Sequence, residues 1–411
     1  MPALLAPGLW SLVASAGLTL SAQAGARVEA RAEQVRPPVG ENTMNEVLEV
    51  EPAIGLLGLS PTLRLEAGYA PRLTRAAGDG PDSDTWLQRA WVRARWHASP
   101  TWQLQARLTA ITGTVDLFRV ATAPSQPGEP PPVGQAAPVA TTLDYRRYEL
   151  VLGAEGRLNR HFDLRGDVAL MQEGGASAAE REVLPLQRAA LVRGDLAWRV
   201  TGRTSLAGVF SAITTHYFDV AVATGEPGVT VPRSWSNSMG RAEAVWRTSL
   251  TSHSRARAGA GLVLVDSGAP GTGPGGLKPF GEAALEGETA PGWPRFSGGL
   301  LVAAAPVEDR LSGTITQRAE ARGWGALSPV EYWTLGASAM GARVMDGPTA
   351  REAFVAGELW LTRAVRDVFA ISLGGRWTTQ WPASMPGRTS LPNSRWVAFL
   401  SIQGTWRSHT P

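Results

Sequence analysis

In Trp102-Gln103-Leu104-Gln105-Ala106-Arg107-Leu108-Thr109-Ala110, apolar and polar side chains alternate without interruption, and this stretch decides the fold class. Successive side chains of a β-strand point to opposite faces, so the stretch has one apolar face and one polar face. The segments 161–172 and 185–200 repeat the pattern, and helical spacing of apolar residues is not sustained over a comparable length. The sequence therefore predicts a chain built from amphipathic β-strands.

Eighteen segments show this alternation, and the 30 prolines of the chain fall almost entirely between them. Proline cannot donate a hydrogen bond to a neighbouring strand, so its spacing independently supports the strand boundaries. The segments 26–35, 47–58 and 294–306 are the least distinct, which leaves sixteen strands as the alternative. The expected strands are 26–35, 47–58, 61–71, 85–97, 101–115, 141–155, 161–172, 185–200, 204–217, 234–249, 254–266, 278–288, 294–306, 310–323, 330–344, 352–363, 368–380 and 394–407.

The connections between these segments alternate between short turns and long loops, which is typical of an up-and-down antiparallel sheet. An even strand count places both termini on the side of the short turns. One connection, 307–309, is short where the alternation requires a long one. The longest loop, 116–140, carries six prolines and either folds inward as a constriction or stands outside; a surface loop is the favoured interpretation.

The amino terminus is apolar, because residues 1–26 contain no charged side chain. The stretch ends in Ala22-Gln23-Ala24, which matches an A-x-A cleavage site, so a secretory signal peptide over 1–24 is predicted. An apolar anchor is the alternative. The remaining residues, 25–411, are expected to form a single barrel domain.

The composition excludes several classes of protein. The chain has no cysteine, one lysine (Lys278), a net charge of +3 and a mean hydropathy of -0.08. The lack of cysteine excludes disulfide scaffolds and thiolate metal sites. The mean hydropathy speaks against a polytopic helical membrane protein, and the small net charge speaks against a dedicated nucleic-acid binder. The glycines of 271–276 lead into a strand rather than a helix, and Asp79, Asp82 and Asp84 lack EF-hand spacing. We therefore expect no enzyme, no cofactor and no metal site.

The apolar faces of the predicted strands carry tryptophan near their ends. Tryptophan prefers the membrane interface, where its ring is buried and its N–H stays hydrated, and two such belts flank the apolar band of a membrane barrel. Core tryptophan of a soluble β-sandwich is the alternative. The expected lipid-interface residues are Trp86, Trp96, Trp102, Trp198, Trp246, Trp333, Trp377, Trp396 and Trp406.

The opposite faces carry many charged side chains, which a soluble core would not accept but an aqueous lumen would. Arginine exceeds acid in the middle strands. Two interpretations remain open: a positive wall that favours anionic solutes, and arginines that pair with acids across strands and stiffen the wall. The candidate pore-lining residues are Arg89, Arg93, Arg95, Arg107, Arg147, Glu149, Arg165, Asp167, Arg193, Asp195, Arg199, Arg255, Arg257, Arg318 and Glu320.

The last predicted strand, Trp396-Val397-Ala398-Phe399-Leu400-Ser401-Ile402-Gln403-Gly404-Thr405-Trp406, resembles the aromatic-ended final strand of Gram-negative outer-membrane proteins, although five residues follow Trp406. With the apolar leader, the alternation and the aromatic belts, the chain resembles an outer-membrane β-barrel porin. Its size is similar to that of the porins of Wzx/Wzy-dependent polysaccharide export. TonB-dependent receptors carry a plug and more strands, so they do not fit.

The resemblance implies an all-β, single up-and-down antiparallel barrel in the outer membrane of a Gram-negative bacterium. It implies outer-membrane lipid, the barrel-assembly machinery and a periplasmic polysaccharide-export protein as partners, and no nucleic acid. Three functions follow as hypotheses: an export porin for acidic polysaccharide, a general or anion-preferring diffusion porin, and a non-conducting scaffold whose lumen is closed by salt bridges.

Overall fold

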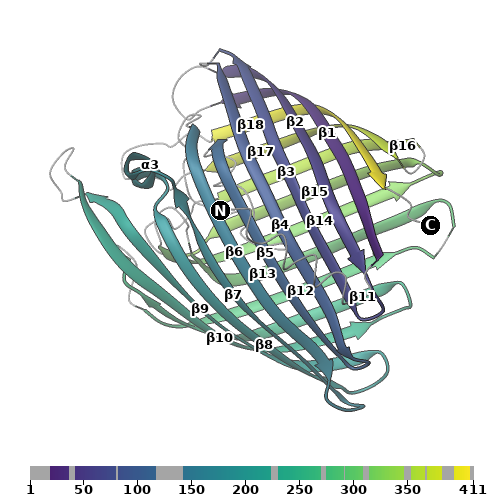
Figure 1. Ribbon diagram of the computed structural model, residues 1–411. Coiled ribbons are helices and arrows are strands. Elements are labelled where there is room, and N and C mark those ends of the chain that lie inside the picture. The colour runs from purple at the N-terminus through teal and green to yellow at the C-terminus, as the bar shows by residue number, and fades with distance from the viewer. Residues whose placement is uncertain are drawn as a thin grey trace.

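The computed structural model describes residues 19–36, 42–79, 82–116, 142–223, 230–269, 275–290, 292–308, 314–346, 353–365, 368–381 and 393–407. Within these ranges the chain forms eighteen antiparallel strands in one sheet (Figure 1). The strands are β1 (Thr19–Arg36), β2 (Thr43–Leu59), β3 (Leu63–Gly78), β4 (Ser83–Ser99), β5 (Trp102–Asp116), β6 (Thr142–Arg157), β7 (Phe162–Gly175), β8 (Leu186–Arg199), β9 (Thr204–Ala223), β10 (Thr230–Ser249), β11 (Ser254–Ser267), β12 (Gly276–Glu288), β13 (Arg295–Glu308), β14 (Ile315–Ser328), β15 (Trp333–Val344), β16 (Ala353–Val365), β17 (Phe369–Trp381) and β18 (Asn393–Arg407).

The sheet closes on itself because the first and last strands pair. Each strand is hydrogen-bonded to its neighbours in the sequence, and β1 pairs with β18 over Gln23–Arg36 opposite Arg407–Ser394. Closure gives every strand a hydrogen-bonded neighbour on both sides, which is the condition for a sheet to span a membrane. The predicted eighteen-strand antiparallel barrel is confirmed, and the sixteen-strand alternative is not adopted.

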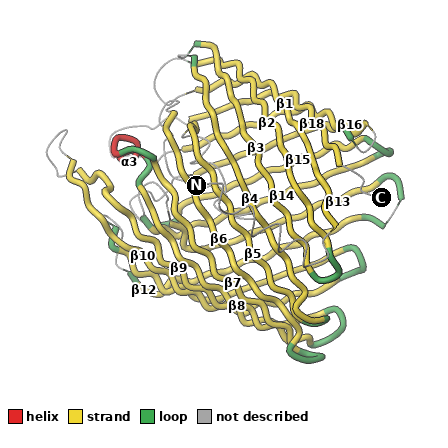
Figure 2. The backbone as a smooth tube through the Cα atoms, viewed as in Figure 1, coloured by secondary structure: helices red, strands yellow, loops and turns green. Residues whose placement is uncertain are grey.

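Short turns join the strands at one end of the barrel, as the sequence predicted. Residues 60–62, 100–101, 158–161, 200–203 and 250–253 make such turns, drawn in green in Figure 2. The strand expected to begin at 310 begins instead at Ile315, so the connection after Glu308 is longer than the predicted 307–309. The long-loop side therefore keeps the expected alternation there. The proline-rich loop 116–140 lies outside the described residues from 117 onward.

The connection between β7 and β8 contains a short helix, α3 (Ala178–Val183), where a loop was expected. Ser177 caps its amino terminus, and Glu180 completes a capping box. The helix was not predicted because six residues are too few to show helical periodicity. Leu184, just after α3, is buried against Leu143 and Tyr145 of β6. Among the described residues, no helix is long and apolar enough to cross a membrane.

The two faces of the wall differ in the way that a membrane barrel requires. Large apolar side chains stand exposed on one face, among them Leu108 (50%), Leu170 (51%) and Val192 (55%), whereas the carboxylates of Glu29 and Glu49 are buried on the other. A water-soluble barrel would bury the first set and expose the second. An outward apolar band facing lipid and a polar interior account for both.

Strand β1 begins at Thr19, earlier than the predicted strand at 26. Residues Thr19–Ala24 pair with Leu59–Ile54 of β2, so they extend the sheet toward the short turns. A strand that started at Gly25 would keep its pairing with β2 from Ala53 and with β18 from Thr405 onward. Removal of residues 1–24, as the signal-peptide prediction expects, would leave these pairings in place.

Candidate pore lumen

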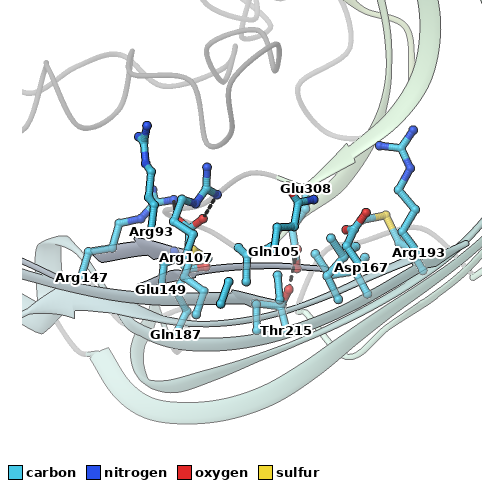
Figure 3. Close-up of a pocket in the computed structure, with 18 of the residues that line it drawn as sticks. Arg93, Gln105, Arg107, Arg147, Glu149, Asp167, Gln187, Arg193, Thr215 and Glu308 are labelled. Atoms are coloured by element: carbon cyan, nitrogen blue, oxygen red, sulfur yellow. Dashed lines mark hydrogen bonds and ion pairs between the residues drawn. The ribbon is translucent and has the colours of Figure 1, made fainter. Parts of the chain in front are cut away.

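The interior of the barrel contains a cavity of about 950 Å³ that is lined mainly by the inward faces of β3–β9 (Figure 3). Eight arginines and four carboxylates line it, an excess of four positive charges in a chain whose net charge is +3. Nine predicted pore-lining residues meet in this cavity: Arg93, Arg95, Arg107, Arg147, Glu149, Arg165, Asp167, Arg193 and Arg318.

Some of these arginines are paired. Arg147 donates to Glu149 at 2.7 Å and to Glu173 at 3.3 Å, and Arg107 donates to the other oxygen of Glu149. Glu173 is fully buried and also accepts a hydrogen bond from the Tyr145 hydroxyl at 3.1 Å. This cluster joins β5, β6 and β7 and fits the second of the two open interpretations, in which arginine stiffens the wall.

Other arginines in the same cavity have no ion pair with any described residue: Arg93, Arg95, Arg165 and Arg193. Figure 3 shows the side chains of Arg93 and Arg193 extending away from the wall. Arg93 lies directly opposite Arg107 in the pairing of β4 with β5, which brings two cations together. Asp167 lies opposite Arg193, yet no ion pair forms between them in the described structure. These four side chains are available to an anion in the lumen.

The remaining predicted pore-lining residues also lie on inward faces but outside this cavity. Asp195 and Glu320 are paired, with Arg247 and with Arg318 at 3.0 Å. Arg89 lies 5.5 Å from the ring centre of Trp91. A second cavity of about 510 Å³ beside the short turns contains the other three, Arg199, Arg255 and Arg257, together with Arg203 and Arg247.

A balanced ion network at the seam of the barrel was missed by the sequence reasoning. Arg31 contacts Glu29, Glu33 and Glu49 at 3.4, 3.2 and 3.3 Å, and all four side chains are buried. The signal was present, because Arg27-Val28-Glu29-Ala30-Arg31-Ala32-Glu33 places every charge on one face of a strand. The network contains five arginines and five glutamates: Arg27, Arg31, Arg72, Arg376, Arg395, Glu29, Glu33, Glu49, Glu51 and Glu358.

The tryptophans predicted for the lipid interface lie on the outward face, toward the two ends of the strands. Seven are exposed: Trp86, Trp96, Trp198, Trp246, Trp333, Trp396 and Trp406. Trp102 is half-buried against Gly156, and Trp377 stacks on Trp396 with ring centres 6.3 Å apart. Trp91 and Trp360, which were not assigned to the interface, alternate onto the inward face and cover Gly68 and Gly336. The interface tryptophans therefore differ from Trp91 and Trp360 in their position along the strand and in the face of the wall on which they lie.

Within the described ranges, no group of three or more histidine, aspartate or glutamate side chains is arranged to hold a metal ion. No protein-family model and no curated protein matches the chain.

Solved structures of large barrels do resemble it. A mutant of the ferric enterobactin receptor PfeA of Pseudomonas aeruginosa is 8% identical, with a TM-score of 0.51, over 94% of this chain and 80% of that chain. The ferric-catecholate import receptor Fiu of E. coli K12 is 10% identical, with a TM-score of 0.50, over 94% and 82%. Pseudomonas aeruginosa OpdQ is 9% identical, with a TM-score of 0.45, over 95% and 99%. At these identities the likeness to the two receptors shows the fold alone: the chain has the architecture of a large outer-membrane β-barrel.

Proposed function

We propose that this protein is an outer-membrane pore that favours anionic solutes. The observation that carries the proposal is the cavity wall, where eight arginines face four carboxylates and Arg93, Arg95, Arg165 and Arg193 lack an ion-pair partner among the described residues. A charged wall in a low-dielectric barrel concentrates ions of the opposite sign and lowers their barrier to entry. The outward apolar band and the tryptophans at both ends support an outer-membrane location.

The basic surface continues toward the short turns, which favours an extended anion over a compact one. Arg203 and Arg255 have no ion pair with any described residue, and they line the second cavity. A linear acidic polymer would contact several arginines along this path at once. The finer form of the proposal is that the pore exports an acidic polysaccharide, which a periplasmic export protein delivers to it. The mature chain would begin after signal-peptide cleavage near Ala24.

Ion selectivity in planar bilayers tests the pore. Under a salt gradient, the refolded protein should give a reversal potential of the sign expected for anions. Replacing these four arginines together, as Arg93→Ala, Arg95→Ala, Arg165→Ala and Arg193→Ala, should move the reversal potential toward zero or past it. Arg363→Ala is the matched control, because the Arg363 side chain lies over Trp333 on the outward face. This variant should leave the reversal potential unchanged. A cation-selective parent protein would refute the proposal.

Polymer block of the current tests the finer form. Polygalacturonate added on the short-turn side should interrupt the ion current, whereas neutral dextran of equal length should not. The arginine variant should lose the block. Anion selectivity with equal effects of the two polymers would leave a diffusion pore and exclude the acidic-polysaccharide form.

A further inference from the structure

We propose that the upper parts of β13 and β14 fold into the lumen as a gate, and that Glu308 is the latch that holds this gate against the opposite wall. The two segments, Ala305–Glu308 and Ile315–Gln317, are called the inner arms below. The consequence for transport rests on the proposed pore, whereas the position of the inner arms can be tested without it.

The inner arms leave the wall where β12 and β13 separate. The pairing of these strands stops at Gly281 and Ala304, although β12 continues to Gly276 and β13 to Glu308. The inner arms nevertheless stay paired with each other, up to Glu308 opposite Ile315. The pair of arms has therefore left its neighbour in the sheet as one unit.

The contacts of Glu308 show where the inner arms go. Its carboxylate accepts a hydrogen bond from Thr215 Oγ1 of β9 at 2.9 Å and from Asn237 Nδ2 of β10 at 2.5 Å. Strand β13 is four strands from β9 around the sheet, which corresponds to about 19 Å along the wall. Direct contact is possible only because the end of β13 crosses the interior, and Figure 3 shows Glu308 reaching Thr215 from the far side of the cavity.

The arm from β14 is held against the wall at its end by Ile315 and nearer its base by Gln317. Ile315 is buried against Val263, Val265 and Phe280, which face inward from β11 and β12. Asp346, after β15, accepts a hydrogen bond from Lys278 at 2.6 Å and another from the backbone N–H of Gln317, so the only lysine of the chain bridges β12 and β15 across the arms.

This arrangement suits a hinged element. Pro306, Val307 and Glu308 line the main cavity opposite the arginine wall, so their position sets the free width of the lumen. The β14 arm holds by the apolar packing of Ile315 and the hydrogen bond from Gln317 to Asp346, whereas the β13 arm reaches β9 and β10 through hydrogen bonds to the carboxylate of Glu308. Loss of the hydrogen bonds to that charged group would free the β13 arm from β9 and β10 while the contacts of the β14 arm remain.

Crosslinking tests the position of the inner arms. The chain has no cysteine, so Thr215→Cys with Glu308→Cys introduces the only two thiols. A short bis-methanethiosulfonate reagent should join them in folded protein in membranes, seen as a reducible band shift. Thr215→Cys with Ser338→Cys, whose second position lies in the wall strand β15, should not crosslink. Absence of crosslinking in the first pair, or equal crosslinking in both, overturns the proposal.

Single-channel recording tests the gate. Glu308→Ala should raise the ratio of open to closed dwell times about tenfold or more, because it removes two hydrogen bonds to a charged group. Thr215→Val removes one donor without changing the charge of the lumen and should shift the ratio in the same direction by less. Glu308→Gln keeps an acceptor and should retain most closures. The crosslinked cysteine pair should hold the low-conductance state until it is reduced.

The outcomes separate the two proposals. Crosslinking without any ion current in the parent or the variants would refute the proposed pore and support the inward position of the inner arms. Normal current with unchanged dwell times in Glu308→Ala and Thr215→Val would overturn the gate and keep the pore.

Discussion

Arg395 in the last strand donates to the carboxylate of Glu33 in the first strand, across 362 residues of sequence. Their side chains meet diagonally where β18 pairs with β1, since Arg395 lies opposite Val35. They lie next to Arg31, which binds Glu29, Glu33 and Glu49. The backbone ladder closes the barrel, and this ion network fixes the same seam from the inside. Because its arginines and glutamates are equal in number, the seam is neutral, whereas the cavity wall of β3–β9 is positive.

Removal of one buried partner at the seam should destabilise the barrel strongly. Glu33→Ala leaves Arg31 and Arg395 without a shared carboxylate, and both guanidinium groups are largely buried. The expected loss is about 3 kcal/mol, because two buried guanidinium groups lose the carboxylate that both of them contact. The temperature at which the folded band converts to the unfolded band in a detergent gel should fall. Glu66→Ala, which breaks an exposed pair with Arg64, should cost about 0–1 kcal/mol; equal losses in both variants would contradict the assignment.

Neighbouring residues of β8 offer a matched test of the lipid face. Val192 is 55% exposed on the outward face, and Leu191 lines the cavity. Val192→Arg should destabilise the barrel in bilayers by about 2–4 kcal/mol, because a charge would lie in the hydrocarbon region. Leu191→Arg should change stability by about 1 kcal/mol or less and alter conductance instead. Urea titration in lipid vesicles measures both, and the reverse ranking would mean that the faces are exchanged.

Gly113 in β5 should not tolerate a side chain. Its φ is +130°, and an added Cβ would lie 2.0 Å from the carbonyl oxygen of Trp86. Gly113→Ala should cost about 1–3 kcal/mol, because the strain is in the backbone and the clash is with backbone atoms. Gly194→Ala, where nothing lies within 4 Å, should be neutral or slightly stabilising. The temperature at which the folded band converts to the unfolded band in a detergent gel, measured for both variants, tests this difference in stability.

The cap of α3 should depend on pH. Burial raises the pKa of the Glu180 carboxyl, but hydrogen bonds from Ser177 and from the backbone N–H groups of Asp144 and Ala176 outweigh it and hold the pKa below its ordinary value. The folded state thus favours the ionised form, so the stabilisation is complete above the ordinary carboxyl pKa of about 4.3 and is lost as pH falls through the lower folded value.

Amide hydrogen exchange of Ser177 and Asp144 follows this change, since their N–H groups donate to Glu180 at 2.6 and 2.9 Å. Protection should stay constant down to weakly acidic pH and decline in stronger acid. Glu180→Gln should remove the pH dependence. A decline centred above the ordinary carboxyl pKa would show that another group controls the cap.

The sequence by itself determined the strands, their faces and the barrel. Period-2 alternation such as that of Trp102–Ala110 is a local property, because an extended backbone points successive side chains to opposite faces of the sheet. The same rule put Arg93, Arg147 and Arg193 on the inward face and Trp198 on the outward face.

Only the tertiary structure decided which charges are paired and what enters the lumen. Arg147 is paired, whereas Arg193 forms no ion pair with a described residue, although both alternate inward next to acids, because pairing depends on register and rotamer across strands. Glu308 meets Thr215 because β13 leaves β12, and Arg395 meets Glu33 because the chain closes on itself. These contacts join residues 93 and 362 positions apart, and no local pattern along the chain encodes that distance.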